Sequence, residues 1–207
     1  TVAVTTTLYT PLNRTDLGEA ISFWYNIAND NLSNQDRVSR VAAAGITPGT
    51  AQAANNYVGS GVGDDYFGAP NTWVVRAVTD MSTLFRYKNK SSHPDVSNWD
   101  TAHVTTMEGM FNGTSFDQDI TSWNLSNVTN MKNMFLANTT FNQNISNWDT
   151  SSATTMENMF SGATVFNQDV SSWNVKNVIT MKNMFAGTTA FSQNTKTNVL
   201  WDWPVNS

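Results

Sequence analysis

The chain has 207 residues, only 13% of them charged, and a formal net charge of -5. Its 11 lysines and arginines do not make the basic surface that nucleic-acid-binding proteins use, and the lack of cysteine excludes disulfides and thiolate sites. No apolar run approaches the roughly 18 residues that cross a membrane as a helix. The sequence starts at Thr1 without a signal-peptide pattern, so we expect a processed N-terminus or a piece of a longer chain.

Residues 1–72 are predicted to form an N-terminal cap made of a strand and helices. The first nine residues alternate threonines with Val2, Val4 and Leu8, a pattern typical of a strand. Asp16 and Glu19 have the spacing of a capping box. They open an apolar series at helical spacing, which predicts a helix (Leu17, Ala20, Ile21, Trp24, Ile27, Ala28).

The rest of this cap is predicted to be a second, shorter helix over residues 33–44, closed by Gly45, and a loop over residues 59–70. The loop contains Gly61-Val-Gly63-Asp64-Asp65, which suggests calcium or phosphate binding. It lacks the ligand spacing of an EF-hand and the Lys-Ser/Thr of a P-loop, so we interpret it as a plain glycine-rich loop.

Residues 73–193 repeat a single pattern about five times, with four tryptophans spaced 24, 25 and 25 residues apart. All nine methionines of the chain lie in fixed columns of the repeat. A constant period of this length predicts a solenoid, in which successive coils stack. The predicted core is Trp99, Trp123, Trp148, Trp173, Met107, Met131, Met156, Met181, Phe111, Phe135, Phe160 and Phe185.

Each repeat is predicted to combine a short strand with a short helix. Val128, Met131, Met134 and Phe135 are spaced so that they share one helical face, and residues 144–148 are typical of a short extended piece. Neither half buries its apolar side alone, so coils must stack, with residues one period apart about 5 Å from each other where strands pair. Methionine suits this core because its side chain adapts to irregular gaps.

Polar columns support the same stacking. The residue after the first methionine of each repeat alternates in charge, which predicts a column of inter-coil ion pairs (Glu108, Lys132, Glu157, Lys182). Exposed pairs contribute on the order of 0 to 1 kcal/mol each, so the column is expected to select register more than to stabilise. A glutamine column and an asparagine column at 133, 158 and 183 predict amide ladders that satisfy the turn backbone.

The runs F-N-Q-D/N-I/V-S-x-W-D/N and V-T-x-M-x-N-M-F resemble the repeats of bacterial surface proteins called BspA-type leucine-rich repeats, typified by mycoplasma surface lipoproteins. The resemblance covers roughly residues 73–193 and matches a long motif four to five times. It implies an α/β solenoid, a leucine-rich-repeat-like right-handed coil of short strand plus short helix. It also implies a surface-exposed, non-enzymatic role in adhesion or interaction.

Three patterns suggest sites, and each has a structural explanation that we favour. The column Asp95, Asp119, Asn144, Asp169 and Asn194 suggests a cation, but its alternation with Asn favours hydrogen-bonded turns. His93 and His103 have no partner at ligand or triad spacing, and we expect both on the surface. The tryptophan column suggests sugar stacking, yet a regular apolar column is typical of a core.

Threonine pairs at 105–106 and 154–155, with Thr129 and Thr180 nearby, suggest the threonine rows of ice-binding solenoids. We interpret them as recurring only in every other coil and as lying on the helical half, which leaves ice binding a remote alternative. Residues 194–207 are predicted to cap the far end of the array with Leu200, Trp201 and Trp203.

The sequence therefore predicts no enzyme, no cofactor and no metal. We expect an extracellular, cell-surface or virion-surface module that recognises a protein or glycan partner, with glycosylation and oligomeric state left open. The alternative is a self-assembling subunit of an extracellular filament or a capsid-decorating protein. In it the N-terminal strand with Val2, Val4 and Leu8 adds to the edge of a neighbour, a capsid subunit or a second copy.

Overall fold

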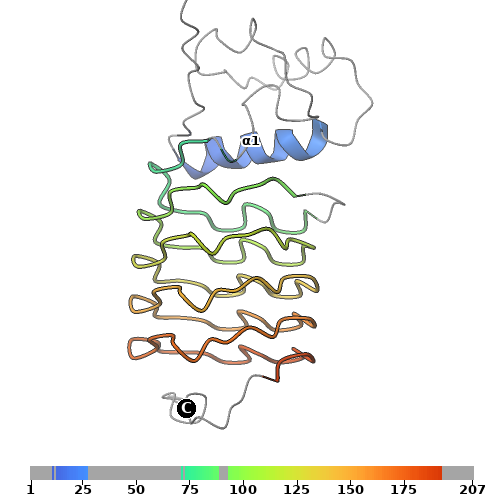
Figure 1. Ribbon diagram of the computed structural model, residues 1–207. Helices are drawn as coiled ribbons and strands as arrows, with labels where there is room; N and C mark the ends of the chain where they lie inside the picture. Colours follow the sequence, from blue (N-terminus) through green and yellow to red (C-terminus); the bar gives the residue numbers. More distant parts are fainter. Residues whose placement is uncertain (1–10, 12, 28–70, 72, 89–92, 193–207) are drawn as a thin grey trace, which may run out of the picture.

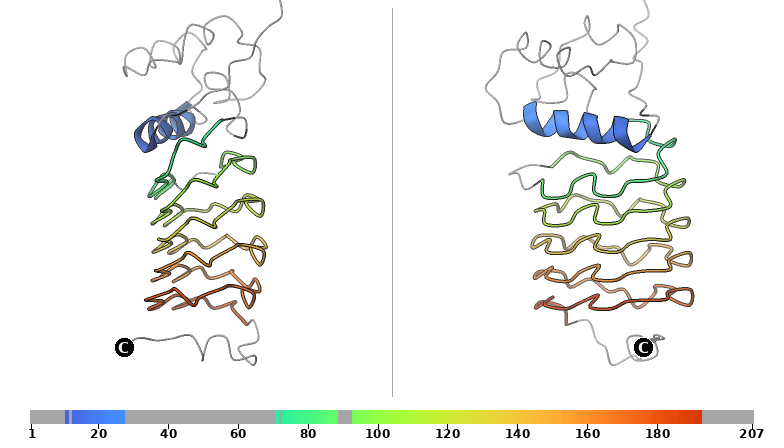
Figure 2. Two further views of the ribbon diagram at one scale, coloured as in Figure 1. Left: turned by 90° about the vertical axis from the view of Figure 1, so that its left-hand side faces the viewer. Right: turned by 180° about the vertical axis from the view of Figure 1, so that it is seen from behind.

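The computed structural model describes residues 11, 13–27, 71, 73–88 and 93–192. Within them there is one helix, α1 (Arg14–Ile27), and the backbone pairing is limited to isolated bridges. Beyond α1 the chain winds through similar turns stacked along one axis, and the views agree on their order (Figures 1 and 2). We call these turns coils 1 to 5, beginning at Trp73, Trp99, Trp123, Trp148 and Trp173.

Parallel backbone pairing at one position per coil sets the register of the stack. The paired residues precede the first methionine of each repeat and lie 24 to 26 positions apart (Asp80, Thr106, Asn130, Thr155, Thr180). The piece predicted to be extended, residues 144–148, contains a turn instead, in which the Trp148 N–H bonds to the Ile145 carbonyl at 3.2 Å. Asn144 accepts the Ser146 N–H within the same turn, so its side chain satisfies backbone that a strand would pair.

The short helix predicted in each repeat is wrong, because this segment is a series of turns. In coil 3, the N–H groups of Met134, Leu136 and Asn138 bond to carbonyls three residues earlier, and those between them bond to coil 4. Asn133 and Ala137 have φ values of 58° and 54°, which interrupt a right-handed helix. The next coil supplies the carbonyls, so the backbone is satisfied without the acceptors of a helix.

The apolar columns pack into one core that runs along the stack. The four repeat tryptophans are 3% to 4% exposed, and rings from neighbouring coils stack, with the Trp99 and Trp123 centroids 6.3 Å apart and the ring planes nearly parallel. Phe111 and Phe135 repeat this arrangement at 5.4 Å. The core columns are buried in coils 2 to 4, whereas Met181 and Phe185 in coil 5 are only partly buried. Each fully buried side chain of this size contributes about 1.5 to 3 kcal/mol.

Helix α1 lies across the end of the stack, beside coil 1 (Figures 1 and 2). Leu17, Ala20 and Ile21 are at most 1% exposed and belong to the core cluster, so α1 covers the apolar end of the stack. The helix begins earlier than the capping-box spacing predicted. Asn13 caps it by accepting the Thr15 N–H at 2.8 Å, because Asn offers the same side-chain acceptor two residues before an amide.

Several predictions made from the sequence lie outside the described residues. These are the strand with Val2, Val4 and Leu8, the helix over 33–44, the loop over 59–70, and the C-terminal cap with Leu200, Trp201 and Trp203. They stay predictions, as does the handedness of the coil.

Candidate interaction surface

Four of the five Asp and Asn side chains that suggested a cation site each close a turn, and the fifth, Asn194, lies outside the described residues. Asp95, Asp119, Asn144 and Asp169 accept the N–H two residues ahead at 2.9 to 3.0 Å. These backbone hydrogen bonds favour the charged form and lower the pKa of the three carboxyls below the usual value. The described part of the chain holds no group of three or more His, Asp or Glu that suits a metal ion.

Short polar side chains also tie one coil to the next through backbone carbonyls. Asn127 donates to the Ala102 carbonyl at 2.8 Å, and Asn177 to the Ser151 carbonyl. The glutamine column does the same, because Gln143 donates to the Asp117 carbonyl at 3.0 Å rather than to another glutamine. Asn158 and Asn133 do form an amide pair between coils, at 3.0 Å. Much of the Asn, Ser and Thr content therefore holds the stack together.

The alternating charge column forms one direct ion pair among its four residues in the described coils. Lys132 and Glu157 lie 3.0 Å apart, nitrogen to oxygen, and both side chains are about a third exposed. Glu108 instead accepts a hydrogen bond from Asn130 at 3.0 Å, and Lys182 is exposed in coil 5. Solvent screening keeps the contribution of such a pair small.

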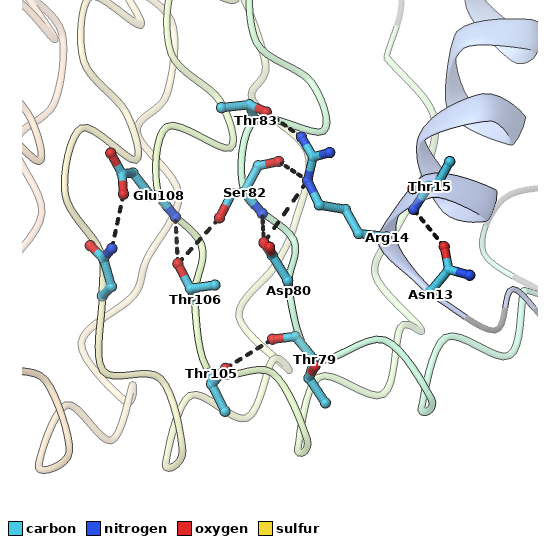
Figure 3. Close-up of polar contacts among 11 residues, drawn as sticks. Asn13, Arg14, Thr15, Thr79, Asp80, Ser82, Thr83, Thr105, Thr106 and Glu108 are labelled. Atoms are coloured by element: carbon cyan, nitrogen blue, oxygen red, sulfur yellow. Dashed lines mark hydrogen bonds and ion pairs between the residues drawn. The ribbon is translucent and has the colours of Figure 1, made fainter.

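Threonines form a continuous row over the outside of coils 1 to 4, which the sequence interpretation missed. Its members are Thr79, Thr105, Thr129 and Thr154, with Ile179 at the same position in coil 5. Each threonine after the first donates its hydroxyl to the carbonyl of the one before, at 3.0 to 3.2 Å. The row lies beside the bridged residues and recurs in coils 1 to 4, although threonine pairs occur only in coils 2 and 4. The placement on a helical half is wrong, because this segment forms no helix; Figure 3 shows the Thr79–Thr105 contact.

We call this row and its bridged neighbours the threonine face: Thr79, Asp80, Thr105, Thr106, Thr129, Asn130, Thr154, Thr155, Ile179 and Thr180. Its residues are exposed or half-buried, and Asp80 is the one ionisable group among them. The parallel pairing fixes their spacing from coil to coil at about 5 Å. The face is therefore similar in composition from coil to coil, nearly uncharged and periodic.

Neither histidine belongs to the threonine face, although His103 lies two residues before Thr105. His93 is half-buried, within 3.1 Å of the Ser115 hydroxyl and edge-on to the Phe116 ring. Burial lowers the pKa of His93 to about 4, so the ring is neutral at pH 7. His103 is exposed. The expectation that both lie on the surface is therefore wrong for His93, which packs against an apolar ring.

Large exposed apolar side chains are few in the described coils. Ile179 and Tyr87 are each 65% exposed, and Val165 is 41% exposed. The Arg86 guanidinium lies 4.8 Å from the centre of the Tyr87 ring, and that ring covers Gly113 of the next coil. These residues belong to different coils, and of the three only Ile179 lies on the threonine face.

Within the described residues no helix is long and apolar enough to cross a membrane. No curated protein and no solved structure matches the chain. One family model does match it twice, over residues 64–137 and 112–204, which together include every repeat. These matches extend over more than half of the chain. The protein therefore belongs to the family described as Mycoplasma protein of unknown function, DUF285.

Proposed function

We propose that this protein is a non-enzymatic recognition module, exposed on a cell or virion surface, that binds a protein or glycan partner through the threonine face. Its fold is proposed to be a solenoid of the leucine-rich-repeat kind, like the BspA-type repeats of mycoplasma surface lipoproteins that its motifs resemble. Membership of the DUF285 family is consistent with that relationship. The observation that carries the proposal is the regular, nearly uncharged threonine face.

The chemistry of this face suits a polar, repetitive partner. Hydroxyl and amide groups both donate and accept hydrogen bonds, and they match the hydroxyls of a glycan or an exposed polypeptide backbone. The turns behind the face are fixed by side-chain and inter-coil hydrogen bonds, so few of these groups lose conformational freedom on binding. A single contact is weak, but the same group recurs coil after coil, and several contacts made together raise the affinity.

Adding positive charge to the threonine face tests the proposal. The variant Thr105→Lys/Thr129→Lys places two cations on neighbouring coils of the face, and Thr139→Lys/Thr164→Lys places two on exposed loops elsewhere. Binding is measured to immobilised glycans of defined sequence and to purified extracellular-matrix proteins. We expect the first variant to lose at least about tenfold in affinity, which is about 1.4 kcal/mol, while the control binds as the unaltered protein does. Equal binding by both variants, or no binding by the unaltered protein, contradicts the proposal.

The threonine row favours a second candidate, binding to a regular lattice such as ice. Four in-register threonines on bridged backbone supply a periodic array, which the sequence interpretation placed in alternate coils only. Thermal hysteresis and the shape of ice crystals grown with the protein test this candidate directly. If the unaltered protein gives the same thermal hysteresis and the same crystal shape as the Thr105→Lys/Thr129→Lys variant, ice binding is ruled out.

A further inference from the structure

On one side of the stack, four backbone N–H groups in each of coils 1 to 4 donate to the next coil, whereas the neighbouring row donates to the previous coil, as the Thr105 N–H does to the Thr79 carbonyl. In coil 2, the N–H groups of Met107, Gly109, Phe111 and Gly113 donate to coil 3 carbonyls at 2.8 to 2.9 Å. The equivalent four N–H groups of coils 1, 3 and 4 also donate to the following coil. An ordinary β-strand edge presents both N–H and C=O groups. Over the segment that begins at the first methionine of each repeat, each coil gives donors to the next coil and acceptors to the previous one.

The reason lies in the turns within each coil. In coil 3, the carbonyls of Met131, Asn133 and Phe135 accept N–H groups three residues ahead, so they are not available to coil 4. The carbonyls that remain are those of the residues between, and they accept from coil 2. A stack built this way has unlike ends: one ends in carbonyl acceptors and the other in N–H donors.

At the acceptor end, α1 occupies the place of a preceding coil. Ser82 of coil 1 corresponds to Glu108 of coil 2, whose carbonyl accepts a backbone N–H at 2.9 Å. The Ser82 carbonyl accepts the Arg14 Nε–H at 2.7 Å, and Arg14 also bonds the Thr83 hydroxyl (Figure 3). Arg14 Nε lies 3.9 Å from the Asp80 carboxylate. A cation thus meets the carbonyl end of aligned peptide groups, as at a helix C-terminus.

At the donor end, coil 5 presents the same four N–H groups without an acceptor among the described residues. They belong to Met181, Asn183, Phe185 and Gly187. The side chains of Met181 and Phe185 are partly buried, whereas their counterparts in coils 2 to 4 are covered on both sides. Among the described residues this edge therefore combines backbone donors that have no acceptor with partly exposed apolar side chains, which favours covering by a complementary partner.

We propose that the donor edge of coil 5 is built to dock on the acceptor edge of coil 1 of a second copy, and that α1 keeps this acceptor edge covered. Two donor edges that meet bring no row of carbonyls to match the four N–H groups. The coil 1 edge offers carbonyls at 80, 82, 84 and 86, in register with the four donors. Displacing α1 then allows copies to stack head to tail.

The experiment displaces α1 in the full chain with Leu17→Asp/Ile21→Asp, since both side chains are fully buried against the stack. Thr15→Asp, on an exposed position of the same helix, is the matched control. Mass is followed by size-exclusion chromatography with light scattering over a range of concentrations. We expect the displaced variant to reach at least twice the monomer mass, with the control unchanged. Adding Met181→Lys, which puts a charge on the donor edge, is expected to restore the monomer.

Hydrogen exchange of the core amides of coils 2 to 4 shows whether the stack stays folded in these variants. If the displaced variant keeps this protection and stays monomeric at every concentration, the proposal is overturned. If protection is lost, the Arg14→Glu variant replaces this test, because it keeps Leu17 and Ile21. It removes the cation from the Ser82 carbonyl and puts a negative charge there, which repels the carbonyl. Concentration-dependent association of Arg14→Glu that Met181→Lys reverses supports the proposal, and a monomer overturns it.

Discussion

The same phenylalanine substitution is expected to cost different amounts in the middle and at the end of the stack. Phe135 is fully buried in coil 3, where its ring contacts Phe111, Phe141, Phe160 and Trp148 at centroid distances of 4.0 to 6.4 Å. Phe→Ala at a buried site costs about 3 to 5 kcal/mol through lost transfer energy and the cavity left behind. With rings on both sides, we expect about 4 kcal/mol for Phe135→Ala.

Phe185→Ala is the internal comparison. The ring occupies the same column in coil 5, but it is partly buried and its ring contacts come from Phe160, Phe166 and Phe191. Part of the transfer energy is absent because the ring already meets solvent, and solvent fills part of the cavity. We expect a loss of about 2 kcal/mol, half of that at Phe135.

Urea unfolding monitored by tryptophan fluorescence measures both losses, because the buried tryptophans of coils 1 to 5 report the unfolding of the stack. Phe135→Leu serves as a control of size, and we expect it to cost less than half as much as the alanine variant. Equal losses at Phe135 and Phe185 refute the reasoning, since position in the stack then has no effect on burial energy. A repeat stack broken in the middle also unfolds in separable parts, so a second transition in Phe135→Ala supports it.

Three further predictions test single contacts. Gly113→Ala is expected to cost about 1 to 2 kcal/mol in urea unfolding, because φ is +66° and the new Cβ meets the Tyr87 ring at 2.5 Å; a neutral result contradicts the required left-handed turn. Glu157→Lys, beside Lys132, is expected to cost at most about 1 kcal/mol and to recover when combined with Lys132→Glu; a double-mutant cycle without coupling shows that the pair does not act across coils. His93 has a pKa of about 4 in the fold against 6.5 unfolded, so the unfolded chain binds more protons between these values and stability falls as pH falls through that window. Because the ring is partly exposed, we expect a loss of about 1 kcal/mol, measured as a drop in melting temperature that His93→Asn abolishes.

The sequence alone determined which residues are buried and which residues are equivalent. The tryptophan at 148 and the phenylalanine at 135 lie in the core because a constant period places their counterparts in the neighbouring coils. The Asp/Asn column at 95, 119, 144 and 169 was interpreted as turns, and each side chain does accept the amide two residues ahead. Both features depend on short-range chemistry or on the period, and a sequence records these directly.

The tertiary structure decided where the backbone hydrogen bonds go. Helical spacing relates Val128, Met131, Met134 and Phe135, but it indicates only that the four side chains share a buried face. A series of turns with hydrogen bonds to carbonyls three residues earlier places them on one face equally well. Gly and Asn at 109, 113, 133, 158, 162, 183 and 187 were a usable signal, because these residues favour the left-handed conformation found there. The threonine face was missed for the same reason: Thr79 and Thr129 join Thr105 and Thr154 only when the pairing position is known.

The polarity of the stack depends on hydrogen bonds between neighbouring coils, and its capping by Arg14 depends on contacts between residues 68 and 69 positions apart, neither of which a local pattern encodes. Apolar spacing fixes which side chains leave water, because that depends on each residue's own chemistry. Which carbonyl an N–H finds depends on what the folded chain brings near it. In this protein the acceptor is either three residues earlier in the same coil or a residue of a neighbouring coil, so the path of the backbone depends on the stacking as well as on the repeat.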